Sequence, residues 1–415
     1  MNKTQFNSNF RMVTLGVILL LSSCKKDPED IIVNSTASKY TLEGTYSESK
    51  ALSADQIWTI KGRVVFKSGT TLTIEPGTII KAEGGTGTNA SLIIIAKGAA
   101  INAEGNVNQP IVFTSVADDI QKGQKVGSNL NAESIKGLWG GLIILGDAPI
   151  SPKSGTTAQI EGVPGDLIEG NYGGANDADN SGVMKYVSIR FGGALIGADN
   201  EINGLTLGGV GSGTVIENVE VIGNIDDGIE FFGGTVDVKN AVVAYQGDDA
   251  FDVDQAYSGT LDNFIYIAGS GSDHGLEIDG PEGSANSSGA FTFKNGLLKG
   301  LSAEYADFRD GARGTIENCY FFGFNEEADF ELDDDASSNN YKSGALSFSG
   351  VTFNAPAGIT LVDIVVDKST TTHAGEFATA FAKNNSIGTD KPVGFNKSAF
   401  DGWSLISTLE VYKDF

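Results

Sequence analysis

The sequence contains little cysteine, which cross-links small secreted domains, and little histidine, which is common in metal sites. Its 415 residues include only two cysteines and two histidines. Cys24 belongs to an N-terminal signal, so Cys319 has no partner and a disulfide framework is excluded. We expect Cys319 to behave as a small buried apolar residue on a strand. His274 and His373 lie far apart in the sequence and form no recognisable metal motif.

Positive charge is also scarce. The chain has 28 lysines and arginines against 53 aspartates and glutamates, which gives a formal net charge of −25. The first 23 residues contain two basic residues, Lys3 and Arg11, and no acidic one, so their removal would change the net charge to −27. Such a charge opposes binding to nucleic acids and to polyanionic glycans.

The apolar run from Met12 to Leu21 is too short to span a bilayer and has the character of a signal peptide. It ends in Leu21-Ser22-Ser23-Cys24, which resembles a bacterial lipobox and implies cleavage before Cys24 and acylation of that residue, for example with palmitate. The acidic run Asp27-Pro28-Glu29-Asp30 resembles the surface-export signal of Bacteroidota lipoproteins. That resemblance implies a lipid anchor in the outer membrane with the protein facing the cell exterior; the alternative is an anchor that faces the periplasm.

A short phrase centred on Asn repeats through the second half of the chain. The Asn residues are separated by 22, 23, 32 and 23 positions, and each follows a Gly and a β-favouring run. They are Asn218, Asn240, Asn263, Asn295 and Asn318. A period in the twenties without a helical pattern indicates a parallel β-helix, one coil per repeat. We expect each Asn to adopt a left-handed backbone at a bend and to bond the Asn of the next coil.

The remaining segments complete this organisation. We predict a signal peptide over residues 1–23, a lipidated tether over 24–40, the β-helix over 41–360 and a C-terminal cap over 361–415. Polar, Gly-rich stretches at 118–136 and 151–180 interrupt the strand pattern and predict projecting loops. Within the cap, residues 375–383 have a helical pattern.

Several longer phrases resemble a family of Bacteroidota surface lipoproteins. They include Trp139-Gly-Gly-Leu-Ile-Ile-Leu-Gly146 and Asp226-Asp-Gly-Ile-Glu-Phe-Phe-Gly-Gly234. The resemblance covers roughly residues 60 to 410. It implies an all-β, right-handed parallel β-helix of the pectate-lyase-like type, and it implies no particular activity.

A second recurrence places acidic residues on another strand of each coil. Strict alternation predicts that Ile229, Phe251, Leu276, Phe308 and Phe330 face inward. The residues that follow them form one outward column, Glu230, Asp252, Glu277, Arg309 and Glu331, and a second column contains Asp254, Asp279 and Asp333. Carboxylates on neighbouring coils, about 4.8 Å apart, repel by roughly 3 kcal/mol at an effective dielectric constant of about 20.

Three interpretations of these columns remain open. The acids could solvate an outer sheet, bind calcium or catalyse. For calcium, the order Asp177-x-Asp179-x-Ser181-Gly182 resembles the start of a calcium-binding loop, although Ser188 occupies the position of the final Glu. The candidate calcium ligands are Glu230, Asp252, Asp254, Glu277, Asp279, Asp177 and Asp179.

For catalysis, Asn224-Ile-Asp226, Asp248-Asp249 and Asp273-His274-Gly275 resemble the Asn-x-Asp, Asp-Asp and Gly-His-Gly signature of polygalacturonases. The resemblance implies that Asp226, Asp248 and Asp249 act as acid and base, assisted by His274, in inverting hydrolysis with carboxyl groups about 6.5–9.5 Å apart. Asp273 replaces a Gly, and Arg309-Asp310-Gly311 does not match the family's Arg-x-Lys.

These observations favour a lipid-anchored surface β-helix that binds calcium along its acidic face and presents its loops to a polysaccharide or a surface protein, without catalysis. The alternative is a polygalacturonase-like hydrolase. No nucleic acid partner is expected.

Overall fold

The computed structural model describes residues 39–196, 202–370 and 374–413. The signal peptide, most of the tether and the predicted lipidation site Cys24 lie outside the described residues, as does His373. Among the described residues, no helix is long and apolar enough to cross a membrane.

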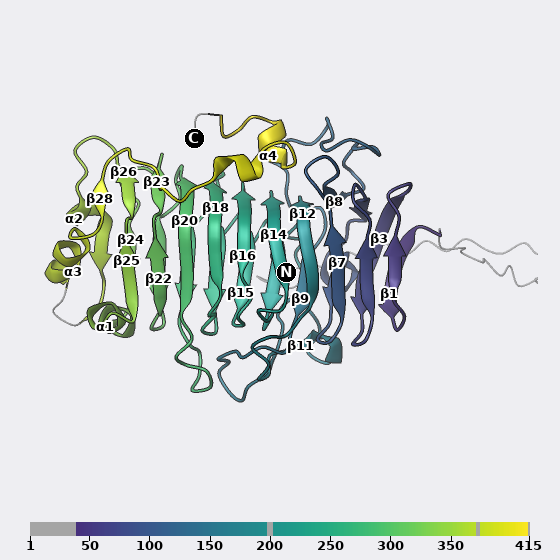
Figure 1. The fold of residues 1–415 in the computed structure, drawn as a ribbon, viewed down its shortest axis with the longest axis horizontal. Helices are drawn as coiled ribbons and strands as arrows, with labels where there is room; N and C mark the ends of the chain where they lie inside the picture. The colour runs from purple at the N-terminus through teal and green to yellow at the C-terminus, as the bar shows by residue number, and fades with distance from the viewer. Residues whose placement is uncertain (1–38, 197–201, 371–373, 414–415) are drawn as a thin grey trace, which may run out of the picture. The chain divides into compact units, whose positions relative to one another are not determined.

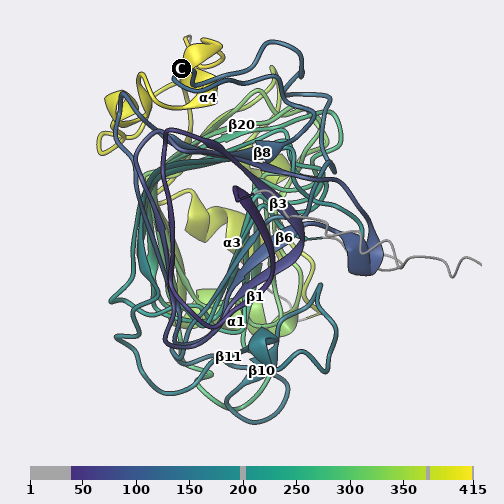
Figure 2. The same ribbon diagram turned by 90° about the vertical axis from the view of Figure 1, so that its right-hand side faces the viewer.

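The strands wind into a right-handed parallel β-helix, as predicted (Figures 1 and 2). Each coil contributes to three parallel sheets, which we number 1 to 3. Two strands bend from sheet 2 into sheet 3: β1 (Thr41–Tyr46) and β3 (Ile57–Phe66). Five bend from sheet 1 into sheet 2: β12 (Gly182–Arg190), β14 (Val215–Ile222), β16 (Val238–Ala244), β18 (Thr260–Ile267) and β20 (Phe291–Lys299).

The shorter strands belong to one sheet each. Sheet 1 also contains β2 (Lys50–Leu52), β4 (Thr71–Ile74), β7 (Ala100–Glu104), β22 (Gly314–Glu317) and β25 (Leu346–Ser349). Sheet 2 also contains β5 (Ile79–Ala82), β8 (Ile111–Ser115), β23 (Tyr320–Phe322), β26 (Thr352–Asn354) and β28 (Ser386–Ile387). Sheet 3 also contains β6 (Leu92–Ile95), β9 (Leu142–Leu145), β13 (Leu205–Gly208), β15 (Ile229–Phe232), β17 (Phe251–Asp254), β19 (Leu276–Asp279), β21 (Ala306–Arg309), β24 (Phe330–Leu332) and β27 (Val365–Asp367).

The Asn residues form the predicted ladder at the bend between sheets 1 and 2. All five have left-handed backbone, with φ between 51° and 62°. The side-chain amide of Asn240 donates to Asn218 at 3.0 Å, and that of Asn263 donates to Asn240 at 2.6 Å. Asn295 donates to Asp262 instead, at 2.6 Å, because Asn263 is engaged by the backbone of Asn396. The ladder therefore stabilises the bends and also docks a distant segment of the chain.

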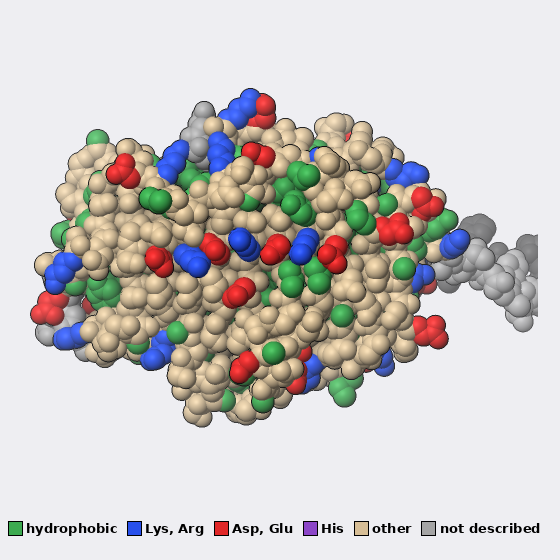
Figure 3. Space-filling view, in the orientation of Figure 1, with side chains coloured by type: hydrophobic (Ala, Val, Ile, Leu, Met, Phe, Trp, Pro, Cys, Tyr) green, Lys and Arg blue, Asp and Glu red, His purple; other side chains and the backbone are tan. Residues whose placement is uncertain are grey.

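The outward face of sheet 1 carries charges whose sign alternates from coil to coil. The register places them in one column: Glu104, Lys185, Glu217, Lys239, Asp262, Lys294 and Glu317. Ion-pair distances are 3.8 Å for Lys185–Glu217 and 3.9 Å for Lys294–Asp262. In Figure 3, blue and red side chains alternate in a row across the middle of this face. Each charge of this column thus lies opposite a charge of the other sign on a neighbouring coil.

The C-terminal segment, residues 389–413, covers the outward face of sheet 2 at β14, β16 and β18. Ile222, Val242 and Ile265 point away from the coil and pack against Trp403 and Ile406. The segment contains η3 (Lys397–Phe400) and α4 (Leu405–Thr408) and runs back along the coil (Figure 1). These residues were predicted to form an end cap. They instead cover a side of the coil, which explains why β14, β16 and β18 also bury apolar side chains on their outward face.

Three helices lie at the C-terminal end of the coil (Figure 1): α1 (Asp335–Ser343), α2 (Leu361–Ile364) and α3 (Ala374–Phe381). Phe381 of α3 packs against Phe330 of the last coils at a ring separation of 5.4 Å. The projecting loop at 151–180 contains η2 (Ile168–Gly170) and a small antiparallel pair, β10 (Ala158–Gln159) and β11 (Asn171–Tyr172). A further short turn is η1 (Gly87–Asn89).

Candidate functional site

The acidic residues lie on the outward face of sheet 3, between β13 and β24. The residues predicted to face inward are all buried in the core. The register gives one column of Thr206, Glu230, Asp252, Glu277, Asp307 and Glu331. We call the face that bears this column the acidic face.

The register corrects the predicted place of Arg309. Glu277 lies opposite Asp307, and Arg309 lies opposite Asp279 in the second column. Phe308 accordingly packs beside Ile278 rather than Leu276. A shift of two residues leaves every side chain on the same face of a strand, so alternation alone could not distinguish Asp307 from Arg309.

The first part of the acidic face is covered, although its side chains point away from the coil. Glu230 is 4% exposed and Asp252 is 9% exposed. The projecting loop folds back over this region: Tyr172 donates its hydroxyl to Gln255 at 3.1 Å, and the Ser151 amide donates to the Gln255 carbonyl at 3.0 Å. The expectation of a solvated outer surface is therefore wrong for these two carboxylates.

Asp227, Glu230 and Asp252 form a cluster in which one oxygen of each lies within 4.8 Å of the others. The side-chain amide of Asn203 donates to Glu230. Within the described residues, Oδ1 of Asp252 and Oδ1 of Asn203 are buried without a hydrogen-bond partner, and no Lys, Arg or His forms an ion pair with the three acids. Four oxygen-bearing side chains thus converge with unused acceptor capacity.

Burial and like charge together raise the pKa values of these acids. Burial and then the charge of Asp252 raise the pKa of Glu230 well above its usual range. Burial and then Asp227 do the same for the pKa of Asp252. The charged forms are therefore costly unless a cation is bound.

Asp227 also has a structural role, which it shares with other carboxylates at the turns before the sheet 3 strands. Asp227 accepts the Asp249 amide of the next coil at 3.0 Å, and Asp249 accepts the His274 amide of the coil after that at 2.7 Å. Glu304 accepts the Asp329 amide at 2.7 Å in the same way. Each carboxylate satisfies a backbone donor on the following coil.

His274 is clamped by acids. Its Nδ1 lies 2.8 Å from Oδ1 of Asp249 and 3.4 Å from Oε2 of Glu277. Burial opposes the charged imidazole, but the Asp249 hydrogen bond and the charges of Asp249, Asp273 and Glu277 outweigh it and raise the pKa of His274 to about 9. A protonated His274 neutralises this part of the site and is a poor metal ligand there.

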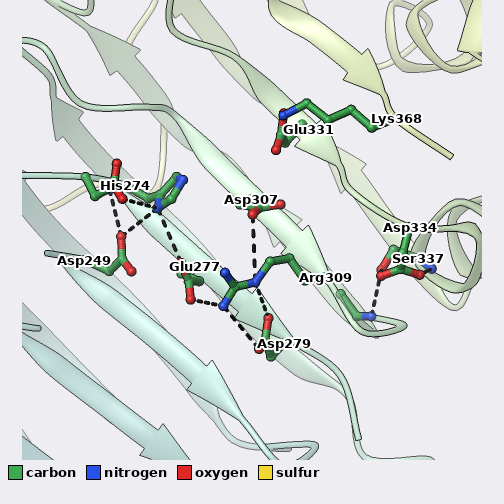
Figure 4. A network of polar contacts seen from close by, with 12 residues as sticks. Asp249, His274, Glu277, Asp279, Asp307, Arg309, Glu331, Asp334, Ser337 and Lys368 are labelled. Carbon is green, nitrogen blue, oxygen red and sulfur yellow. Dashed lines mark hydrogen bonds and ion pairs between the residues drawn. The ribbon is translucent and has the colours of Figure 1, made fainter. Parts of the chain in front are cut away.

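Arg309 and Lys368 neutralise the far part of the acidic face (Figure 4). Nε of Arg309 lies 2.7 Å from Asp279, and its Nη2 contacts both Glu277 and Asp279. Lys368 forms an ion pair with Glu331. The acidic face therefore has an uncompensated part at Asp227, Glu230 and Asp252, and a part occupied by cationic side chains.

The predicted calcium ligands are thus divided. Glu230 and Asp252 come together, whereas Glu277 and Asp279 are held by Arg309. Asp254 is near both: burial, then Asp279 and Glu282, raise its pKa to about 8.

Asp177 and Asp179 lie elsewhere, beside the turn that precedes β14. The Asp177 carbonyl accepts the Ser212 amide at 2.9 Å, and Asp179 accepts the Ser181 hydroxyl at 3.1 Å. They join none of the acidic clusters of the described residues.

Asp227 was not predicted from the sequence to join Glu230 and Asp252, although a signal was present. Asp227 precedes Glu230 by three residues, as Asp249 precedes Asp252 and His274 precedes Glu277. This spacing places a polar side chain at each turn, in front of the strand that carries the acidic column.

The structure brings only some of the candidate catalytic residues close to one another. Asp226 and Asp248 cluster with Asp227, with one oxygen of each within 4.8 Å, while Asp249 turns toward His274. Those oxygens are closer than the separation of about 6.5–9.5 Å that accommodates water in an inverting hydrolase.

The sequence and the structure of the chain were compared with those of known proteins. Among solved structures, the chain aligns with the enzymatically active domain of tailspike protein 2 of bacteriophage CBA120, at 11% identity and a TM-score of 0.24, over 82% of this chain and 42% of that one. The chain thus spans less than half the length of that structure. No protein with curated annotation matches the sequence significantly. The family model described as "Pectate-lyase like beta helix domain" matches residues 44–404, and the chain therefore belongs to this family.

Proposed function

We propose that the protein binds a calcium ion between Asp227, Glu230 and Asp252 and uses its acidic face to engage a glycan or a surface protein. The observation that carries this proposal is the group of three buried carboxylates with an unpartnered Asp252 oxygen, which no cationic side chain of the described residues pairs with. Leaving a buried charge unpaired costs several kcal/mol, which a bound cation would offset.

The alternating column on sheet 1 provides an internal comparison. There the chain neutralises stacked charges by alternating Lys with Glu or Asp from coil to coil. The same stacking on sheet 3 brings Glu230 against Asp252 with no basic residue between them. Basic residues could have neutralised these stacked carboxylates in the same way, but the part of the acidic face at Glu230 and Asp252 contains none.

The donor set favours calcium among the common metals. Carboxylate and amide oxygens are the ligands that calcium prefers, whereas zinc and copper sites draw on His and Cys. Asn203 could supply a fourth oxygen by presenting its amide carbonyl. The neighbouring cluster of Asp249, His274 and Glu277 is the less suitable site because His274 is protonated.

Titration calorimetry with calcium chloride tests the metal site directly. We expect one saturable event for the parent and for the matched sheet 1 variant Asp262→Asn, and loss of this event in Asp252→Asn. An absence of heat at millimolar calcium would reject the proposal.

Hydrolysis is a second candidate, which the contact between Asp249 and His274 favours. Under this alternative the enzyme would release reducing ends from a polysaccharide, and Asp249→Asn would abolish the release. Calcium binding and hydrolysis are separable, because the calorimetric signal requires no turnover.

The cellular part of the proposal rests on sequence alone: a lipid anchor at Cys24 in the outer membrane, with the acidic face exposed outside the cell. Mass spectrometry of the mature amino terminus should detect an acylated Cys24. The Cys24→Ala variant should lose both acylation and membrane association. An unmodified amino terminus in the parent would exclude the anchor.

A further inference from the structure

Arg63 lies where β3 bends from sheet 2 into sheet 3, and it has no polar partner among the described residues. Its Nε is buried without a hydrogen bond, and no carboxylate of the described residues forms an ion pair with it. The neighbouring Val64 lies in the core, so alternation directs the Arg63 side chain away from the interior of the coil. Unlike Nε, the terminal nitrogens Nη1 and Nη2 are not enclosed, so their donors are available to a ligand.

The other arginines that the structure describes all have a partner. Each one pairs with an acid or donates to an amide: Arg190 with Glu220, Arg309 with Asp279 and Arg313 with Asn340. The chain has 53 aspartates and glutamates, so acidic partners are plentiful, yet none is placed against Arg63 in the described structure. Burial lowers the pKa of Arg63 and the charge of Asp166 opposes this, but the two side chains form no ion pair. Arg63 therefore stays charged and keeps its terminal donors free.

Arg63 lines a cavity of about 300 Å³ whose other described lining residues are uncharged. They come from the η1 turn, from the projecting loop and from the end of the segment after β12: Gly87, Thr88, Gly162, Val163, Pro164 and Ile196. Val163 and Ile196 also pack against the apolar cluster on the outward face of sheet 3. Gly87 and Gly162 have left-handed backbone, with φ of 59° and 72°, which favours glycine and leaves these positions without a side chain. The cavity thus combines apolar walls with one cationic side chain.

This combination fits a small organic acid. A guanidinium can bind a carboxylate through two parallel hydrogen bonds. Apolar walls favour a ligand with an apolar body over a sugar or inorganic phosphate, because those would need several further polar partners. The volume lies at the lower end of the range of ligand sites, which suits a molecule of a few carbon atoms.

We infer that this cavity binds a small carboxylic acid with an apolar body, whose carboxylate accepts hydrogen bonds from Nη1 and Nη2 of Arg63. The negative net charge of the chain opposes a polyanion more than a single carboxylate, because salt screens most of the distant acids from one charge bound against Arg63. None of the described lining residues belongs to the acidic face, so this inference does not depend on the proposed calcium site.

Calorimetry with three probes tests the inference: 4-methylpentanoate, its neutral amide 4-methylpentanamide, and acetate, which lacks the apolar body. The titrations use the whole chain in a chelating buffer at neutral pH, so that calcium does not contribute and the acids are charged. We expect one saturable event with 4-methylpentanoate, and affinities roughly tenfold or more lower for the amide and for acetate, the loss expected for a charge-assisted contact or for buried methylene groups.

Two arginine variants locate the site. Arg63→Met keeps an apolar stem and removes the guanidinium, so it should lose the binding event. It should melt like the parent, because this guanidinium has no partner among the described residues. The matched control Arg313→Met removes an arginine that donates to Asn340, and it should bind 4-methylpentanoate like the parent.

Several results would overturn the inference. They are an absence of saturable heat at millimolar 4-methylpentanoate, equal affinity for its amide, and an Arg63→Met variant that binds like the parent. Tighter binding of inorganic phosphate would also overturn it, and so would tighter binding of a tripeptide that ends in valine, in favour of the carboxyl terminus of a protein. The calcium titration concerns other residues, so failure of either proposal leaves the other standing.

Discussion

Glu230 on β15 lies directly opposite Asp252 on β17, with both carboxylates buried on the outer face of sheet 3. Neighbouring strands are about 4.8 Å apart, so this pair concentrates negative charge where solvent cannot screen it. Charge, burial and the proposed metal affinity are consequently linked at this pair of carboxylates.

Asp252→Asn should remove the calcium dependence of stability. Calcium at a hundredfold excess over its dissociation constant should stabilise the parent by about 2.7 kcal/mol if it binds the folded state alone. Without metal, the variant should melt no lower than the parent, because it loses a repulsive charge. Thermal melts with calcium and with chelator check both points, and Asp262→Asn should behave like the parent. A calcium-induced shift that persists in Asp252→Asn would place the ion elsewhere.

The metal-free protein should lose stability as pH rises from about 4 to about 9. Asp307, Asp254 and Glu277 have folded pKa values raised to about 7, 8 and 9, so between their ordinary values and these the folded state binds more protons than the unfolded state. His274, raised to about 9, contributes stability that is complete below pH 6.5 and lost through pH 9.

Calcium should oppose part of this loss, because it replaces protons on Glu230 and Asp252. The calcium-induced increase in melting temperature should therefore be larger at pH 8 than at pH 5. Scanning calorimetry across this range measures it. A shift that is largest at pH 5 would contradict a carboxylate site.

Asn240→Ala and Asn240→Gly should separate backbone strain from side-chain bonding. Asn240 has φ of 57° and bonds both Asn218 and Asn263. Both variants lose these bonds, but the alanine also loses about 1–2 kcal/mol in the left-handed region. Urea unfolding should therefore rank the parent above the glycine variant and the glycine above the alanine. Equal stability of the two variants would show that the bend tolerates either residue.

Glu220→Ala should release the C-terminal segment from sheet 2. The buried Glu220 carboxylate accepts the Leu405 amide at 2.7 Å and the Ser188 hydroxyl at 2.6 Å, and lies 3.5 Å from Arg190. Removing one partner of a buried ion pair costs about 3–5 kcal/mol. Unfolding should become easier, and limited proteolysis should cut near residues 389–413 first. The double variant Arg190→Met, Glu220→Met should recover much of the loss; a double variant as unstable as the single one would show that the pair is not the cause.

The repeating phrases were sufficient to predict the fold. Local chemistry places Asn at a left-handed bend, and the same bend accepts Tyr186 with φ of 52° and Gly350 with φ of 67°. The repeat period of the sequence could not predict that residues 389–413 run along the outside of sheet 2. Contacts such as Asn263 with Asn396 join positions with no shared local pattern.

The site was less predictable for two physical reasons. Alternation fixes the face of a residue but not its partner across coils, so Asp307 and Arg309 were exchanged. Burial of Glu230 depends on the projecting loop folding back, which the polarity of that loop does not reveal. The pairing of charges on the acidic face and the burial of its carboxylates could therefore be determined only from the strand register and the positions of the loops.

The alternating column on sheet 1 helps each coil to stack on the correct neighbour during folding. If the coil containing β16 and β17 were looped out, β14 would stack on β18, and Asn218 could still bond Asn263. The apolar interior would also accept the change, since Ile229 would meet Leu276. The charges would not: Glu217 would face Asp262, and attraction would become repulsion. The alternation of charge therefore disfavours a fold in which one coil is skipped. The Asn residues and the apolar interior do not, because they are similar in every coil.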